Sequence, residues 1–103
     1  MKGMNELVRQ AQIMQKKMAK LQEELEVRTV EGTAGGGMVT AVVSGSNELK
    51  SLAIDKAAVD PSDVEMLQDL IVAAVNDGIK KAKAMMEAEM GQLTGGIKMP
   101  GLF

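Results

Sequence analysis

Three short runs typical of strands, separated by glycine-rich or polar turns, lie in the middle of the chain and decide its fold. Residues 27–54 read VRTVEGTAGGGMVTAVVSGSNELKSLAI. The runs at 27–31, 38–43 and 49–54 have the composition of strands, and the intervening GTAGGG and GSN segments have that of turns. Because the connections are short, we expect an antiparallel meander. The central run is apolar at consecutive positions, which predicts a strand covered on both faces.

A long amphipathic helix is predicted on each side of these strands. From residue 4 to about 26, apolar residues alternate spacings of three and four, which is a heptad stripe made of Met4, Leu7, Ala11, Met14, Met18, Leu21 and Leu25. The second helix begins either at Asp60, with Pro61 in its first turn, or at Ser62, with Glu65 completing a capping box. It should stop near Gly91. The predicted class is α+β, with an α-β-β-β-α subunit.

A length of 103 residues predicts a single domain, which we place at residues 1–90. Residues 91–103 contain four glycines and one proline and are expected to form a mobile tail. Helices of about 35–40 Å overhang strands of about 20–27 Å, so one copy would leave apolar stripes and sheet edges bare. A two-fold homodimer resolves this and is the expected assembly.

The composition argues against most enzyme chemistry. The chain has no Cys and no His, which removes thiolate nucleophiles, imidazole bases, disulfides and the usual zinc ligands. Its only aromatic residue is Phe103, so it has no platform for stacking unpaired bases. We therefore predict no catalytic residue, no cofactor and no small-molecule substrate, and we disfavour single-stranded nucleic acid as a ligand.

Two motifs resemble binding sites, but each has a simpler structural explanation. The glycines at 35–37 precede a strand, whereas a phosphate loop needs GK[ST] at the start of a helix, so a hairpin turn is favoured. The acidic pairs Glu23/Glu24 and Asp60/Asp63 could attract a cation. The first pair lies on a predicted helix surface and the second at a helix start, where acids interact favourably with the helix dipole. No metal site is predicted.

The N-terminus is polar and the longest strictly apolar run is six residues, at 70–75. This pattern predicts neither a signal peptide nor a membrane span, and we expect a cytoplasmic protein without a membrane partner.

Charge is segregated along the chain although the net charge is only −2. Residues 1–22 carry five basic side chains against one acidic, whereas residues 60–79 carry five acids and no base. Two basic clusters on overhanging helices favour contacts with the phosphates of duplex DNA. No recognition motif is present, so sequence preference should be weak. The candidate DNA-binding residues are Arg9, Lys16, Lys17, Lys20, Lys80, Lys81 and Lys83.

Two alternatives stay open at this point. The heptad stripe would also suit a foreign helix, so the chain could be a protein-binding adaptor of a DNA-processing complex with no DNA affinity of its own. Lysine clusters are also common on solvated helix faces that bind nothing. A salt-dependent shift of duplex DNA separates these hypotheses.

Several segments, in order, resemble the YbaB/EbfC family of bacterial nucleoid-associated proteins. They are GTAGGGMV at 32–39, running on to LAID at 52–55, LQDLIVAAVND at 67–77, the Met- and Gln-rich first helix and TGGIKMPGLF at 94–103. The resemblance covers nearly the whole chain. It implies an α-β-β-β-α subunit, a homodimer with projecting helices like a pair of tweezers, and binding to duplex DNA in the nucleoid without catalysis.

The resemblance has two limits. It brings no defined set of DNA contacts, so the basic residues above rest on charge and spacing. In addition, Gly78 stands where the family usually carries Ala after Asn-Asp. A glycine inside a helix costs about 1 kcal/mol relative to alanine and permits a local bend.

Overall fold

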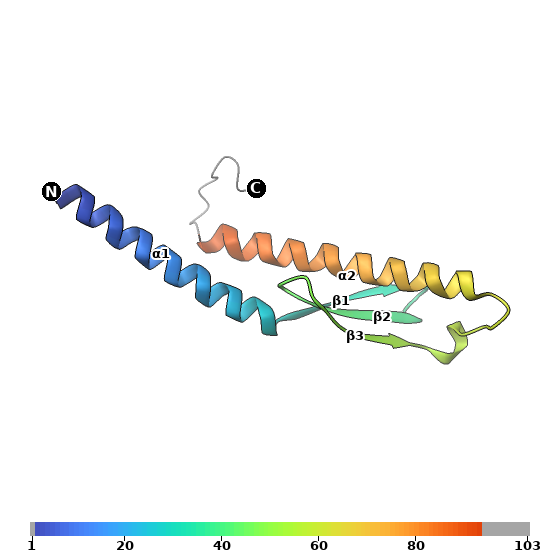
Figure 1. Cartoon of the computed structure of the whole chain (residues 1–103). Helices are drawn as coiled ribbons and strands as arrows, with labels where there is room; N and C mark the ends of the chain where they lie inside the picture. The colour runs from blue at the N-terminus through green and yellow to red at the C-terminus, as the bar shows by residue number, and fades with distance from the viewer. Residues whose placement is uncertain (1, 94–103) are drawn as a thin grey trace.

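The computed structural model describes residues 2–93, which form an elongated α-β-β-β-α subunit (Figure 1). The elements are α1 (Lys2–Val27), β1 (Thr29–Ala34), β2 (Val39–Ser44), β3 (Leu49–Ile54), a short 3₁₀ helix η1 (Lys56–Ala58) and α2 (Val64–Leu93). The subunit measures 73 × 24 × 16 Å. Its radius of gyration is 19.3 Å, against about 13 Å for a compact domain of this length. The predicted class and element order are confirmed.

The three strands form an antiparallel sheet in the order β1-β2-β3. β1 runs three residues further than the sequence predicts, because Gly32, Thr33 and Ala34 pair with β2 and do not belong to the turn. The turn consists of Gly35, Gly36, Gly37 and Met38, so β2 begins one residue later than predicted. All three glycines have positive φ, a backbone conformation that favours glycine. β3 spans the predicted residues.

One face of the sheet carries the core. α2 lies across β1 and β2, and Val39, Ala41 and Val43 of β2 are fully buried beneath it. The expectation that β2 would be covered on both faces is wrong for the single chain, because Thr40 and Val42 point to the other face and stay partly exposed. All six residues of β3 are exposed. The outer face of β2 and the whole of β3 therefore have no helix packed on them in the single chain.

Two glycines face each other where α2 packs closely on the sheet. A Cβ atom on Gly32 would overlap the backbone nitrogen of Gly78 and the carbonyl oxygen of Ala74. Gly in a strand interior often marks such a backbone approach. α2 is one continuous helix through Gly78, and the absence of a side chain there serves packing on β1 and on Val43.

α2 begins at neither predicted cap. The Asp63 carboxylate accepts a hydrogen bond from the Met66 amide at 3.1 Å, which makes Asp63 the N-cap and Val64 the first helical residue. The Ser62 hydroxyl donates to Asp60 at 2.7 Å and so is engaged in the preceding turn. The helix continues through Gly91 to Leu93, and the rest of the predicted tail lies outside the described residues.

α1 is attached to the body only near its C-terminal end. Leu21 and Leu25 are buried, and Gly45 of the β2–β3 turn lies directly against Leu25. Arg28 pairs with Glu89 of α2 at 2.7 Å. We call residues 2–20 of α1 the arm, since every side chain from Gly3 to Lys20 is exposed. Across residues 2–93, no helix combines the length and apolar character needed to cross a bilayer.

Candidate nucleic-acid interface

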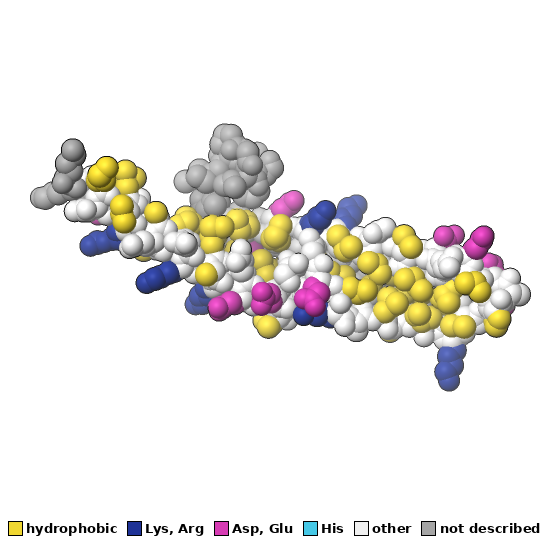
Figure 2. Space-filling model, in the orientation of Figure 1, with side chains coloured by type: hydrophobic (Ala, Val, Ile, Leu, Met, Phe, Trp, Pro, Cys, Tyr) yellow, Lys and Arg dark blue, Asp and Glu magenta, His cyan; other side chains and the backbone are white. Residues whose placement is uncertain are grey.

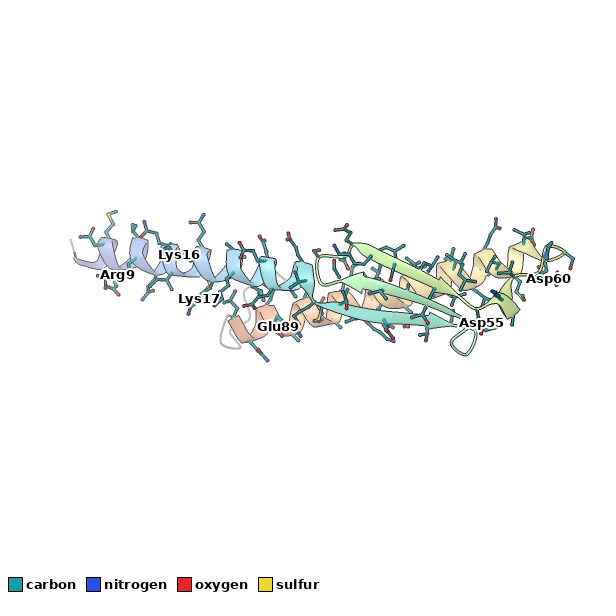
Figure 3. All side chains as sticks on the ribbon, turned by 90° about the horizontal axis from the view of Figure 1, so that it is seen from below. Arg9, Lys16, Lys17, Asp55, Asp60 and Glu89 are labelled. Atoms are coloured by element: carbon teal, nitrogen blue, oxygen red, sulfur yellow. The ribbon has the colours of Figure 1, made fainter. Side chains whose placement is uncertain are left out.

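The four predicted basic residues of α1 lie along one flank of the arm. At 100° per residue, Arg9, Lys16 and Lys20 fall within about 40° of one another, and Lys17 lies about 60° further round. Dark blue side chains project from one edge of the arm in Figure 2, and Figure 3 labels Arg9, Lys16 and Lys17 along it. From Arg9 to Lys20 the flank spans about 16 Å, close to the rise of five base pairs of duplex DNA.

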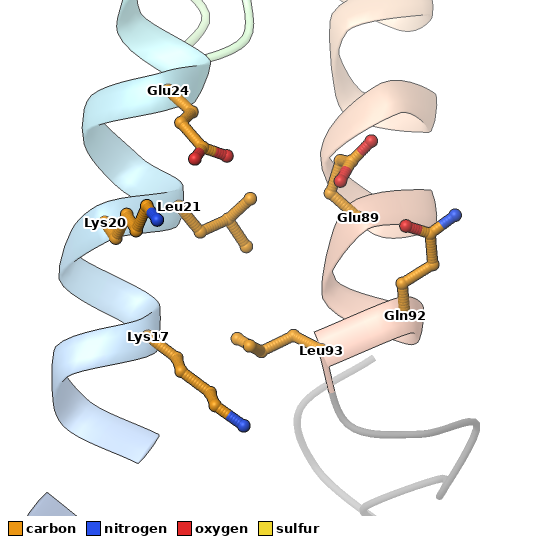
Figure 4. A pocket seen from close by; sticks show the side chains of 7 residues that line it. All are labelled: Lys17, Lys20, Leu21, Glu24, Glu89, Gln92 and Leu93. Carbon is orange, nitrogen blue, oxygen red and sulfur yellow. The ribbon is translucent and has the colours of Figure 1, made fainter. Parts of the chain in front are cut away.

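The base of this flank borders a hollow between α1 and α2 (Figure 4). The hollow has a volume of about 300 Å³ and is lined by Lys17, Lys20, Leu21, Glu24, Glu89, Gln92 and Leu93. Leu21 and Leu93 point toward each other across it, and the carboxylates of Glu24 and Glu89 lie on one side of them. Glu24 and Glu89 share this hollow with Lys17 and Lys20 but form no ion pair with either lysine. Among residues 3–93, Arg9 and Lys16 form no ion pair either.

The three lysines of α2 do not form one surface. Lys81 pairs with Asp77 at 3.1 Å and donates a hydrogen bond to the carbonyl oxygen of Glu31 at 3.0 Å. Lys80 and Lys83 are exposed and, three residues apart, lie on one face of α2 that does not include Lys81. Of the predicted DNA-binding residues, the four of α1 therefore share one flank, and only two of the three lysines of α2 share a face. The i,i+4 spacing of Asp77 and Lys81 was the signal in the sequence for their ion pair.

Asp77 and Lys81 together close the outer edge of β1. Asp77 accepts a hydrogen bond from the Thr33 amide at 3.0 Å, while Lys81 satisfies the Glu31 carbonyl two residues earlier. Unpaired strand edges invite pairing with other chains, and side chains that cap an edge prevent it. These contacts therefore hold α2 against β1. Within residues 2–93, no group of three or more acidic side chains lies close enough to hold a metal ion.

This edge contact predicts a pH dependence of stability. The hydrogen bond from Thr33 and then the one from Lys81 lower the pKa of Asp77 below its ordinary value of 3.8. Because the folded-state pKa is depressed, ionised Asp77 stabilises the fold above the unfolded-state pKa, and this contribution is lost as pH falls through the lowered value. Asp77→Asn keeps an acceptor for Thr33 but removes the charge.

The expected result is a lower melting temperature for Asp77→Asn than for wild type above about pH 5, with the difference shrinking below about pH 4. Melting curves followed by circular dichroism across this range provide the measurement. A difference that stays the same down to the lowest pH would show that the charge of Asp77 is not what stabilises the edge.

Comparisons with known proteins match this chain along its length. The model of the YbaB/EbfC DNA-binding family matches residues 1–97. A protein of Pelotomaculum thermopropionicum is 57% identical over 101 residues, covering 98% of this chain and 96% of the relative. One of Syntrophobacter fumaroxidans is 54% identical, covering 98% and 91%. Both are named nucleoid-associated proteins. The crystal structure of the uncharacterized protein HP0035 from Helicobacter pylori superposes with a TM-score of 0.77 at 28% identity, covering 86% of this chain and 94% of that one.

Proposed function

This chain belongs to the YbaB/EbfC DNA-binding family, and from that premise we propose that it binds duplex DNA in the bacterial nucleoid as a homodimer. The observation that carries the proposal is the exposed basic flank of the arm, Arg9, Lys16, Lys17 and Lys20. Ammonium and guanidinium groups bind phosphates regardless of base sequence. The chain as a whole has a net charge of −2. The positive flank therefore attracts DNA only locally, and this attraction is sensitive to salt.

Sequence preference is weak in this proposal. Neither helix has the context of a recognition motif, and phosphate contacts position a protein without reading bases. Gln10, Gln12 and Gln15 on α1 could add a few contacts to base edges. In this proposal, the distribution of the protein along the chromosome affects nucleoid organisation or gene expression.

The bare half of the sheet supports the homodimer. The chain exposes 7605 Å², against about 5,600 Å² for a compact monomer of 10.9 kDa. On the face that α2 partly covers, Leu52 and Ile54 of β3 lie opposite Ala41 and Val39, yet they are 37% and 38% exposed. Figure 2 shows hydrophobic side chains gathered over this region. A surface of this kind marks a protein interface.

The shape of the bare surface suits a second α2. Asp77 and Lys81 hold β1 on one side of the helix, and Val72, Val75 and Ile79 form a stripe on the opposite side, toward β3. Strands lie about 4.8 Å apart and packed helices about 8–10 Å apart, so a helix beside α2 would lie over β3. In a two-fold dimer, the α2 of each copy covers the bare surface over β3 of the other copy.

The homodimer is tested by charge substitution at β3. Wild type is expected to sediment at twice the chain mass of 10.9 kDa, and Leu52→Glu at the chain mass, because it places a carboxylate in the apolar interface. Ser51→Glu is the matched control, since Ser51 is its exposed neighbour on the opposite face of the same strand. Wild type that is a folded monomer at every concentration would refute the dimer.

DNA binding is tested with purified protein and duplexes of several sequences at two salt concentrations. The proposal expects binding that weakens at the higher salt and differs little between sequences. If wild type shows no salt-dependent binding to any duplex, the adaptor hypothesis replaces this one.

A further inference from the structure

Three methionine side chains gather where the arm joins the body. A hollow of about 370 Å³ between the two helices is lined by Met18 of α1, by Met86 and Met90 of α2, and by Leu21 and Leu25. Met86 and Met90 are four residues apart and therefore lie on one face of α2. Met18 belongs to the heptad stripe of α1 and lines the same hollow from the other helix. We call Met18, Met86 and Met90 the junction cluster.

The junction between α1 and α2 fixes the direction of the arm. Leu21 and Leu25 are the buried residues of α1, and Leu21 lines both this hollow and the one that Figure 4 shows. The ion pair of Arg28 and Glu89 joins side chains that are 47% and 26% exposed, so it contributes little. The attachment of the arm therefore depends mainly on apolar packing between two leucines and the methionines beside them.

The junction cluster is accessible to small oxidants. Met18 and Met86 are 37% and 36% exposed, and Met90 is half-buried. The chain has no cysteine, so methionine thioethers are its only oxidisable sulfur atoms. A lone pair of the thioether sulfur attacks one oxygen of hydrogen peroxide, an S–O bond forms, and the O–O bond breaks. The sulfur is oxidised to a sulfoxide, and the peroxide is reduced to water.

We propose that the junction cluster is an oxidation site at which peroxides loosen the arm. A sulfoxide is polar, and burying a polar group without a hydrogen-bond partner is unfavourable. Sulfoxides in the hollow draw water between α1 and α2, and Leu21 and Leu25 lose their apolar cover. α1 then separates from α2. The core beneath α2 at Val39 and Ala41 does not line the hollow and stays packed.

The consequence for DNA rests on the proposed function. Lys17 and Lys20 border the neighbouring hollow, so the junction that holds α1 also holds these two cations in place. A loosened arm must lose conformational freedom when it binds phosphates, which lowers its affinity. Oxidation is therefore expected to weaken binding to duplex DNA several-fold. Reduction of the sulfoxides by methionine sulfoxide reductases should restore it. None of the apolar residues assigned to the dimer surface lines the hollow, so oxidation there leaves that surface unchanged.

Hydrogen exchange followed by mass spectrometry, on the full chain before and after treatment with hydrogen peroxide, tests the proposal. Peptide masses report which methionines are oxidised and how fast the amides of each segment exchange. In wild type, oxidation of the junction cluster is expected to speed exchange at residues 21–27 of α1. Exchange at residues 39–43 of β2 should not change, which distinguishes a loosened arm from an unfolded chain.

Variants at the junction cluster separate its oxidation from oxidation elsewhere. Met18→Leu/Met86→Leu/Met90→Leu keeps the apolar bulk but has no sulfur at the junction. After peroxide treatment, its exchange at residues 21–27 should stay at the untreated rate. Met4→Leu is the matched control, because Met4 is 67% exposed near the far end of the arm. This variant should respond to peroxide as wild type does. Met18→Gln/Met86→Gln, which places polar amides at the junction, should speed exchange without any oxidant.

The outcomes separate this inference from the proposed function. The proposal is overturned if the junction cluster stays unoxidised while Met4 is oxidised, or if its oxidation leaves exchange at residues 21–27 unchanged. An equal response in the triple leucine variant also overturns it. A loosened arm with unchanged affinity for duplex DNA contradicts the consequence drawn for DNA binding. Untreated wild type that binds no duplex refutes the proposed function, whereas the exchange result at the junction still stands.

Discussion

Gly32→Ala is expected to abolish the native fold. The new Cβ would overlap backbone atoms of Gly78 and Ala74, and backbone cannot rotate out of the way as a flexible side chain can. α2 would have to lift from the sheet, which uncovers Val39 and Ala41. We expect a loss of more than about 4 kcal/mol, comparable with the whole stability of a small domain.

Denaturant titration followed by circular dichroism measures this loss. Gly91→Ala is the control, because nothing lies within 4 Å of the position of its Cβ. In a helix, alanine is favoured over glycine by about 1 kcal/mol, so this variant should be at least as stable as wild type. A Gly32→Ala protein as stable as wild type would contradict the packing of α2 on β1.

Lys16→Glu/Lys17→Glu/Lys20→Glu is expected to abolish binding to duplex DNA while leaving the dimer intact. The triple substitution turns the basic flank of the arm acidic, and phosphates would be repelled. None of the three residues belongs to the heptad stripe of α1 or to the bare face of β3, so assembly should not change. Electrophoretic shifts at one salt concentration, together with sedimentation, give the measurement.

Two further variants test whether the loss of DNA binding is specific to the arm. Lys80→Glu/Lys83→Glu should weaken binding less, because these residues follow the strongly acidic first half of α2. Lys81 is kept because it holds β1. Lys56→Glu, in η1 at the end of the subunit away from α1 (Figure 1), should bind nearly as wild type does. A triple arm variant that binds as tightly as wild type would place the site elsewhere.

The fold could be predicted from the sequence where the pattern is local. The heptad spacing predicts α1, and the alternation at 49–54 predicts β3 with its correct bounds. The sequence predicts a turn at Gly32 because glycine is most often found in turns, whereas in the structure this glycine permits a backbone approach to Gly78, far along the chain. Asp63 became the cap because Asp60 engages Ser62. Both outcomes depend on contacts that no local pattern contains.

The candidate site, like the fold, can be predicted from the sequence only where the pattern is local. Spacing along one helix is enough to group Arg9, Lys16 and Lys20 on a flank. The engagement of Lys81 with Glu31 could not be predicted, since it needs the placement of α2 on β1. Nor does the heptad stripe show which of its positions are covered: Leu21 and Leu25 are buried and Leu7 is bare, although all three fit the same repeat.

The salt dependence of wild-type affinity for one duplex tests the central claim most directly. If the two arms of a dimer neutralise about six phosphates, the logarithm of the binding constant should fall against the logarithm of salt concentration with a slope of roughly −5. The slope should flatten as arm lysines are replaced one at a time. A slope near zero, with binding retained, would contradict the binding of DNA phosphates by the basic side chains of the arm.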